Sequence, residues 1–183
     1  MTTAGRQDRR DLRPAGPGDA ETLYRIYAST REDELAVVPW DTAAKEAFLR
    51  MQFDAQDRYY RATFPNASYD LIVSGEEVLG RLYVDRGETT WLVIDVALLP
   101  GHRGRGIGTR LLAQVLADAG AADRPVQIHV ERSNPAQRLY HRLGFRHIAD
   151  QGVYLLLECK PGPGGEPSPG DRPSQPSQRS QDG

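Results

Sequence analysis

The sequence contains very little cysteine and no long apolar run. Cys159 is its one cysteine, which excludes an intramolecular disulfide and any metal site built from several cysteines. Its four histidines lack the spacing of metal ligands, so we expect no metal. No apolar segment approaches the roughly 18–20 residues that span a bilayer, and the charged N-terminus lacks an apolar signal segment. We therefore expect a cytoplasmic protein with no membrane partner.

An excess of charge of one sign is lacking as well. The 23 Lys and Arg residues nearly balance 25 Asp and Glu residues, which gives a formal net charge of −2. Proteins dedicated to nucleic acids usually carry a strongly basic domain, so we expect no nucleic-acid partner.

Apolar residues are missing from the C-terminal segment. From Pro161 to the end, 23 residues include six Pro, five Gly and four Ser, and none of the set AVILMFWYC. Such a segment cannot bury apolar surface, so we expect a disordered tail at 161–183. Its role is open between a solubilising extension and a partner-binding segment. Residues 1–160 are then expected to form one domain.

Hydrophobic periodicity predicts alternating strands and helices in that domain. The first expected strand ends at 11–14, and the others lie at 69–74, 77–85, 90–98, 126–130, 146–150 and 153–158. Two helices are expected to begin after Asp19 and Asp41, and two more to occupy 109–121 and 135–143. In the helix after Asp41, the residues Phe48, Met51, Ala55 and Tyr59 mark one face, and the acidic run Glu32-Asp33-Glu34 is expected in a loop. The order β-α-α-β-β-β-α-β-α-β-β predicts an α/β fold, a mixed sheet with helices on its faces.

The most informative segment joins an apolar strand to a helix. Strand 93–99 is followed by Pro100 and by Gly101-His102-Arg103-Gly104-Arg105-Gly106-Ile107-Gly108-Thr109. Alternating glycines let backbone N–H groups approach a ligand, and a helix N-terminus adds unpaired donors and about half a positive charge. We therefore expect a phosphate or pyrophosphate here, with Arg103 and Arg105 adding positive charge.

Two common nucleotide motifs do not fit this loop. The P-loop pattern requires a lysine before the Ser or Thr, and Gly108 stands there instead. The dinucleotide fingerprint requires Gly-x-Gly-x-x-Gly and an acidic residue that ends the next strand. Here the third glycine comes one residue early, and Asp123 precedes its strand.

The loop does resemble a different phosphate-binding motif. Arg103, Gly106 and Gly108 satisfy Arg/Gln-x-x-Gly-x-Gly/Ala, the pyrophosphate motif of the GCN5-related N-acetyltransferases, the GNAT superfamily. The run from Asn134 to Phe145, Asn-Pro-Ala-Gln-Arg-Leu-Tyr-His-Arg-Leu-Gly-Phe, resembles the second signature of that family at the right distance. The resemblance is close over residues 69–158 and implies a mostly antiparallel, twisted sheet with helices on both faces.

The resemblance also implies acetyl-CoA as co-substrate and direct acetyl transfer to an amine. In the family, a splay between the fourth and fifth strands admits the pantetheine arm of the cofactor, which pairs with the fourth strand. The positions that match cofactor-binding residues are Val96, Ala97, Leu98, Arg103, Gly104, Arg105, Gly106, Ile107, Gly108, Thr109, Asn134 and Tyr140.

The chemistry assigns roles to a few of these positions. Tyr140 matches a tyrosine near the thioester sulfur, and its phenol can protonate the departing thiolate. A backbone N–H at a strand bulge near Ala97 and Leu98 can stabilise the oxyanion. The base stays open between Asp95, His129 and a water relay.

The orientation of the two base candidates is uncertain from the sequence. The family's glutamate position aligns with Leu92, and alternation along the strand predicts Asp95 on the pleat opposite Leu92 and Ile94. For His129, packing beneath a helix is the main alternative to a role as base.

The expected function is N-acetylation of a primary amine, first of a small molecule and second of a protein N-terminus or lysine. A domain that binds acyl-CoA without turnover is the alternative of a different class. A homodimer is possible. The polar and aromatic groups expected near the acceptor are Glu32, Asp33, Glu34, Trp40, Arg58, Tyr59 and Tyr60.

Overall fold

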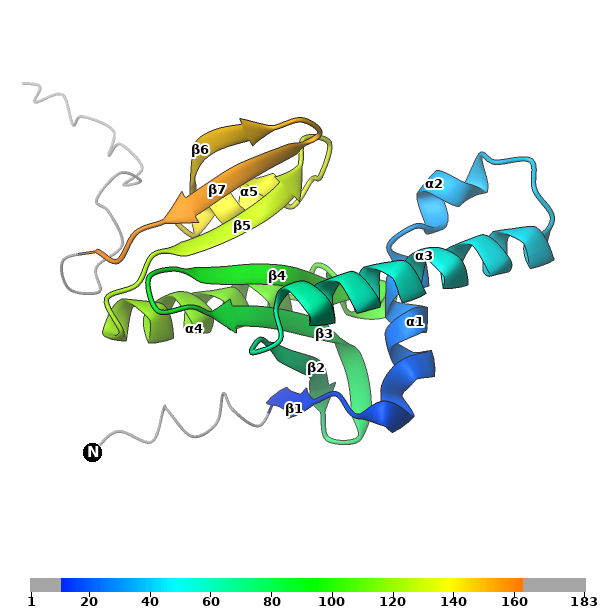
Figure 1. Ribbon diagram of the computed structural model, residues 1–183, viewed down its shortest axis with the longest axis horizontal. Coiled ribbons are helices and arrows are strands. Elements are labelled where there is room, and N and C mark those ends of the chain that lie inside the picture. Colours follow the sequence, from blue (N-terminus) through cyan, green and yellow to red (C-terminus); the bar gives the residue numbers. More distant parts are fainter. Residues whose placement is uncertain (1–10, 163–183) are drawn as a thin grey trace, which may run out of the picture.

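The chain folds into one curved sheet with helices on both faces (Figure 1). The structure is a computed structural model that describes residues 11–162; the expected tail from residue 163 onward lies outside the described part. Its elements are β1 (Leu12–Pro14), η3 (Pro17–Asp19), α1 (Ala20–Ser29), α2 (Glu32–Ala36), α3 (Thr42–Thr63), β2 (Ser68–Ser74), β3 (Glu77–Arg86), β4 (Trp91–Leu98), η4 (Pro100–His102), α4 (Ile107–Ala121), β5 (Val126–Glu131), α5 (Gln137–Arg142), β6 (Arg146–Gln151) and β7 (Tyr154–Cys159).

The seven strands lie in the order β1-β2-β3-β4-β5-β7-β6. Every neighbouring pair is antiparallel except β4 and β5, which run parallel. These two strands pair only from Trp91 to Val93 on β4, and beyond that point they diverge (Figure 1). The mixed, mostly antiparallel sheet expected from the sequence is confirmed, and it opens between its fourth and fifth strands.

Two apolar clusters hold the helices against the sheet. On one face, α4 and α5 bury Leu112 and Tyr140 against strand residues such as Val93 and Leu157. On the other face, α1 and α3 bury Ile26 and Phe53 against β2 and β3. Helices therefore cover both faces, as expected.

Helix α3 begins where its capping residue predicts. The Oδ1 atom of Asp41 accepts a hydrogen bond from the Ala44 N–H at 2.8 Å, which satisfies one free donor of the first turn. The side that packs on the sheet carries Leu49, Phe53 and Tyr60. The face expected from Met51 and Tyr59 points elsewhere, since these side chains are 57% and 62% exposed.

A second expectation is wrong between α1 and α3. The acidic run Glu32-Asp33-Glu34, expected in a loop, forms the first turn of the short helix α2. Acidic side chains in a first turn favour a helix because they interact well with its free N–H groups.

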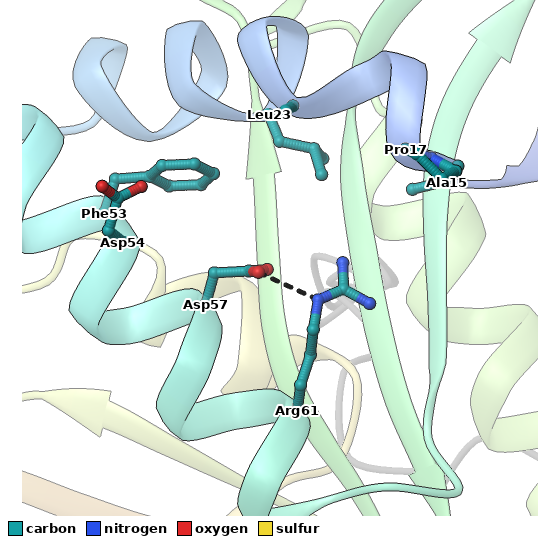
Figure 2. Close-up of a pocket in the computed structure, with 9 residues that line it drawn as sticks. Ala15, Pro17, Leu23, Phe53, Asp54, Asp57 and Arg61 are labelled. Carbon is teal, nitrogen blue, oxygen red and sulfur yellow. Dashed lines mark hydrogen bonds and ion pairs between the residues drawn. The ribbon is translucent and has the colours of Figure 1, made fainter.

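A pocket of about 360 Å³ lies between the start of α1 and the middle of α3 (Figure 2). Leu23 and Phe53 form its apolar wall, and the Asp57 carboxylate accepts a hydrogen bond from Arg61 Nε at 2.9 Å. None of the residues expected to bind a cofactor or react lines it.

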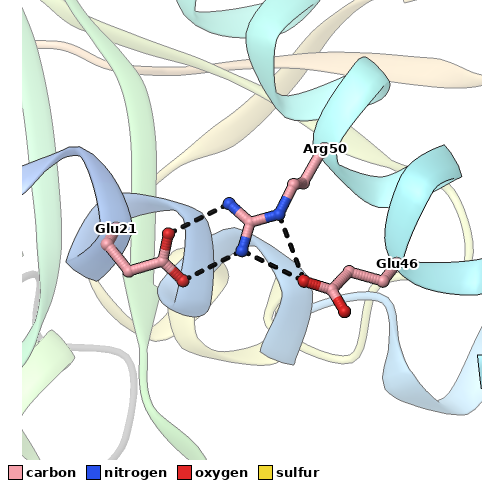
Figure 3. Close-up of polar contacts among 3 residues, drawn as sticks. All are labelled: Glu21, Glu46 and Arg50. Carbon is pink, nitrogen blue, oxygen red and sulfur yellow. Dashed lines mark hydrogen bonds and ion pairs between the residues drawn. The ribbon is translucent and has the colours of Figure 1, made fainter. Parts of the chain in front are cut away.

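Arg50 ties α3 to α1 at the exposed end of their contact (Figure 3). Its guanidinium donates to both carboxylate oxygens of Glu21, at 3.0 and 3.1 Å, and also to Glu46 on its own helix. The same group lies 3.9 Å from the ring centre of Tyr24. These contacts orient α3, whose Tyr60 packs against Tyr83 of β3.

Candidate active site

The glycine-rich loop after β4 presents an open backbone surface. Gly104 and Gly106 have φ angles of +71° and +77°, which side-chain-bearing residues adopt at a cost. A Cβ on either glycine would meet no atom within 4 Å. Hydrogen bonding within α4 starts with the Arg110 N–H donating to Gly106 O at 3.0 Å, so the preceding N–H groups lie ahead of the helix ladder. The loop can therefore accept an anion through its backbone.

The two arginines of this loop differ in what they contact. Arg103 Nε donates to Leu98 O at 2.8 Å, and its Nη2 donates to Ser29 O at 3.0 Å. These bonds join the end of β4 to the end of α1, so this guanidinium supports the loop from behind. Arg105 is exposed at the tip of the loop.

The end of β4 turns backbone groups into the splay. Ala97 O faces β3, because a Cβ on Gly80 would lie only 2.1 Å from it. Alternation along a strand then directs the backbone groups of Val96 and Leu98 to the opposite edge, where β5 has moved away. Leu98 O already accepts the Arg103 bond, so Val96 and the Leu98 N–H offer the free edge.

A bulge in β4 decides where Asp95 points. Tyr83 pairs with Asp95 and Val84 with Val93, so Ile94 is an extra residue on β4. The expected bulge near Ala97 and Leu98 therefore lies three residues upstream. The bulge also puts Ile94 and Asp95 on the same face, which corrects the expectation that they occupy opposite pleats.

Asp95 faces α3 and binds a buried arginine. Arg81 Nη2 donates to Asp95 Oδ2 at 2.5 Å and to Gln56 Oε1 of α3 at 3.1 Å. The Arg81 side chain is 3% exposed, whereas that of Asp95 is 17% exposed. The carboxylate is therefore the part of this ion pair that a ligand can reach.

Tyr140 belongs to the apolar cluster that α4 and α5 form with the sheet, on the face opposite α3. Its ring is buried and packs edge-on against Phe145, with 5.9 Å between ring centres. Burial raises the pKa of Tyr140 to about 12, and the negative charge of Asp95 adds to the effect. The phenol therefore holds its proton at neutral pH.

His129 is placed differently from the expectation. Its neighbours Val126, Ile128 and Val130 are buried in the core beneath α5, and alternation directs His129 to the opposite, exposed face of β5. Packing beneath a helix is therefore wrong for this side chain.

Asn134 shapes the entry to α5. Its Oδ1 accepts the Ala136 N–H at 2.8 Å, a turn that directs the chain into the helix carrying Tyr140. The sequence also suggests Asn134 as a helix cap, but α5 begins at Gln137 with Ala136 as its N-cap, so Asn134 forms a turn before the helix and does not cap it.

Sequence reasoning missed Arg81 and underrated Tyr60. Tyr60 of α3 packs edge-on against Tyr83, whose ring also lies 5.2 Å from the Arg81 guanidinium, and burial raises the pKa of Tyr60. The available signal was an arginine at the centre of β3, flanked by Leu79, Leu82 and Val84. A charge in such a strand indicates a buried partner.

The described residues offer neither a metal cluster nor a membrane span. Within 11–162, no three His, Cys, Asp or Glu side chains group as metal ligands. Over the same residues, no helix is both long and apolar enough to cross a bilayer.

Comparison with known proteins finds one matching family model. Residues 67–147 match the model of the acetyltransferase (GNAT) domain. Comparison with curated proteins finds no match.

Several solved structures share the fold. The PaiA N-acetyltransferase of Thermoplasma acidophilum, in complex with coenzyme A, is 15% identical with a TM-score of 0.63, over 81% of this chain and 97% of that chain. An acetyltransferase of Thermus thermophilus is 24% identical, with a TM-score of 0.59 over 82% and 96% of the two chains. A Corynebacterium glutamicum protein described as histone acetyltransferase HPA2 and related acetyltransferase is 22% identical, with a TM-score of 0.59 over 86% and 97%. Residues 67–147 therefore match a GNAT acetyltransferase domain, and the described chain has the fold of GNAT structures.

Proposed function

We propose that the protein transfers the acetyl group of acetyl-CoA directly to a primary amine, first of all that of a small molecule. The observation that carries this proposal is the splay itself. The free edge of β4 and the glycine loop border the gap that opens beyond Val93, and Tyr140 lies in the apolar cluster that includes Val93. A linear cofactor with a phosphate at one end and a reactive thioester at the other fits that arrangement.

The donor binds mainly through backbone groups. The pyrophosphate lies on the N–H groups from Gly104 to Thr109, at the N-terminus of α4. The pantetheine amides hydrogen-bond the edge of β4 at Val96 and Leu98, as an added strand would. Asn134 lies on the far side of the arm. Coenzyme A in the Thermoplasma neighbour supports this choice of donor.

The chemistry follows from three groups around the thioester. The amine nitrogen attacks the acetyl carbon, a C–N bond forms, and a backbone N–H of the β4 edge stabilises the oxyanion. The C–S bond then breaks, and Tyr140 gives its proton to the thiolate. The proton lost by the amine goes to Asp95, directly or through water. Asp95 is preferred over His129 because it shares the neighbourhood of Tyr140.

Two alternatives to transfer to a small amine predict different experimental outcomes. A protein N-terminus or lysine is the second acceptor class, and the name of the Corynebacterium neighbour is in line with it. A module that binds acyl-CoA without turnover would keep the donor site and lack transfer.

The test is a screen with acetyl-CoA and a panel of amines. The panel holds alkylamines, polyamines, aryl amines, and peptides with a free N-terminus or a lysine. Thiol release and the mass of an acetylated product are measured together. Transfer to a small amine supports the proposal, and transfer only to peptides favours the second acceptor class. Binding of acetyl-CoA with no product from any amine would contradict the proposed transfer and favour a module that only binds acyl-CoA.

A further inference from the structure

A charged side chain is buried in the apolar strand β3. The Arg81 guanidinium lies 5.2 Å from the ring centre of Tyr83 and 6.0 Å from that of Tyr27. Its Nε is buried and has no hydrogen-bond partner within residues 11–162. A buried ion pair adds little net stability compared with apolar side chains of similar volume. Stability alone therefore does not explain Arg81.

The partner of Arg81 lies at the origin of the splay. Asp95 is the first residue after the bulge and the second after the last pair between β4 and β5. Its charge acts on Tyr60 of α3 and on Tyr140 of α5. These two phenols come from helices on opposite faces of the sheet.

Two independent features aim this carboxylate. If β4 ran through Ile94 as a regular strand without the bulge, Asp95 would point with Val93 into the core beneath α4. With the bulge, it points toward α3, and Arg81 holds its Oδ2 atom at 2.5 Å. The other oxygen, Oδ1, accepts no hydrogen bond within the described residues, and the side chain stays accessible to solvent.

On the basis of the proposed acetyltransferase function, we infer that Arg81 is a positioning residue and that the acceptors are cationic aliphatic amines. Arg81 fixes one carboxylate oxygen, so the other accepts an N–H of the acceptor ammonium. A partly buried carboxylate binds a cation far more strongly than a neutral amine. Tyr60, edge-on to Tyr83 at 6.3 Å, offers an aromatic wall that also favours a cation.

Arg81 also has a purely structural explanation, which a control variant isolates. Its bond to Gln56 links β3 to α3, so its loss could simply loosen that helix. Gln56→Leu removes this link and leaves the contact between Arg81 and Asp95 intact. Arg81→Met keeps the length of the side chain and removes the contact.

The test uses two matched probes and equilibrium binding to the protein loaded with coenzyme A. Benzylamine and aniline share a ring and a primary amine, but only benzylamine is protonated at pH 7.5. Calorimetry should show that wild-type protein binds benzylamine at least about tenfold tighter than aniline. Asp95→Asn should erase that preference. Arg81→Met should weaken benzylamine binding about tenfold, and Gln56→Leu should leave it within about twofold.

The double variant Arg81→Met/Asp95→Asn provides a second test if Arg81→Met folds poorly, because it removes both charges of the ion pair and leaves neither unpaired. It should bind benzylamine no more weakly than Asp95→Asn, since Arg81 acts only through Asp95. Coenzyme A affinity within about twofold of wild type reports an intact fold.

Three results would overturn the inference. They are equal or absent binding of both probes to wild-type protein, a loss in Gln56→Leu as large as in Arg81→Met, and a double variant clearly weaker than Asp95→Asn. Because binding is measured, failure of every amine to accept acetyl groups would count against the proposed function alone.

Discussion

Tyr140 combines deep burial with a position beside a carboxylate. Both raise the pKa of its phenol, to about 12, so the proton stays on the oxygen over the whole range in which an acetyltransferase is assayed. A group with this property serves as a proton donor and not as a base. The departing thiolate of coenzyme A is a suitable recipient, because it needs a proton only after the C–S bond breaks.

Tyr140→Phe should therefore lower kcat about 100-fold and leave the affinity for acetyl-CoA within about twofold. Between pH 7 and 10, the pH profiles of kcat for wild type and Tyr140→Phe should have the same shape, because the phenol titrates above that range. Steady-state kinetics and calorimetry measure the two effects. Tyr24→Phe on α1, also buried, is the control. Equal turnover of wild type and Tyr140→Phe would remove the acid role.

A single extra residue limited what the sequence could say about Asp95. Strict alternation from Leu92 places it on the wrong face, because a bulge shifts the pattern by one. A β-bulge depends on the partner strand, and the residue type of Ile94 does not predict one. Arg81 did stand out as a charge in an apolar strand, but its partner Asp95 could not be assigned while Asp95 was expected on the other face.

In helix α3 and the glycine loop, the sequence predicts local backbone features well and the buried face of a helix poorly. Asp41 marks the start of α3, because capping is local chemistry. The buried face is not local: Phe48, Met51, Ala55 and Tyr59 recur with helical spacing, yet Phe53 and Tyr60 form the packed side. Two apolar stripes on one helix cannot be ranked without the sheet. The backbone of the loop is predictable, because glycine position and helix start determine it.

Gly106→Val should abolish acetyl-CoA binding, with a loss of at least about 100-fold, since a branched side chain fills the space beside the loop N–H groups and opposes a φ of +77°. Calorimetry with acetyl-CoA measures it. Gly75→Val, in the turn between β2 and β3, carries similar backbone strain at φ +61° and is the matched control. If both variants bind acetyl-CoA like wild type, the loop does not hold the pyrophosphate.

The whole molecule divides at the splay. Strands β1 to β4 form one antiparallel block and β5 to β7 another, and only three residue pairs join them. The apolar cluster under α4 and α5 crosses that boundary, with Val93 from one block and Leu157 from the other. The opening is thus wide at one end and tightly packed at the other, and the sequence indicated it only through the family resemblance.

A chain that ends at Gly162 should unfold within about 1 °C of the full-length protein and bind acetyl-CoA equally well. The removed residues include none of the apolar types that form a core. Differential scanning calorimetry and binding measurements on both proteins test this. A markedly lower melting temperature would assign residues 163–183 a part in the fold.

The free edge of β4 has a consequence for how such a protein can change over generations. On the proposed assignment, the donor is recognised by peptide groups, which almost any side chain at Val96 or Leu98 preserves. The acceptor is recognised by side chains, chiefly Asp95 and Tyr60. Substitution can therefore accumulate along the donor half with little penalty, and a few exchanges in the acceptor half redirect the enzyme to a new amine.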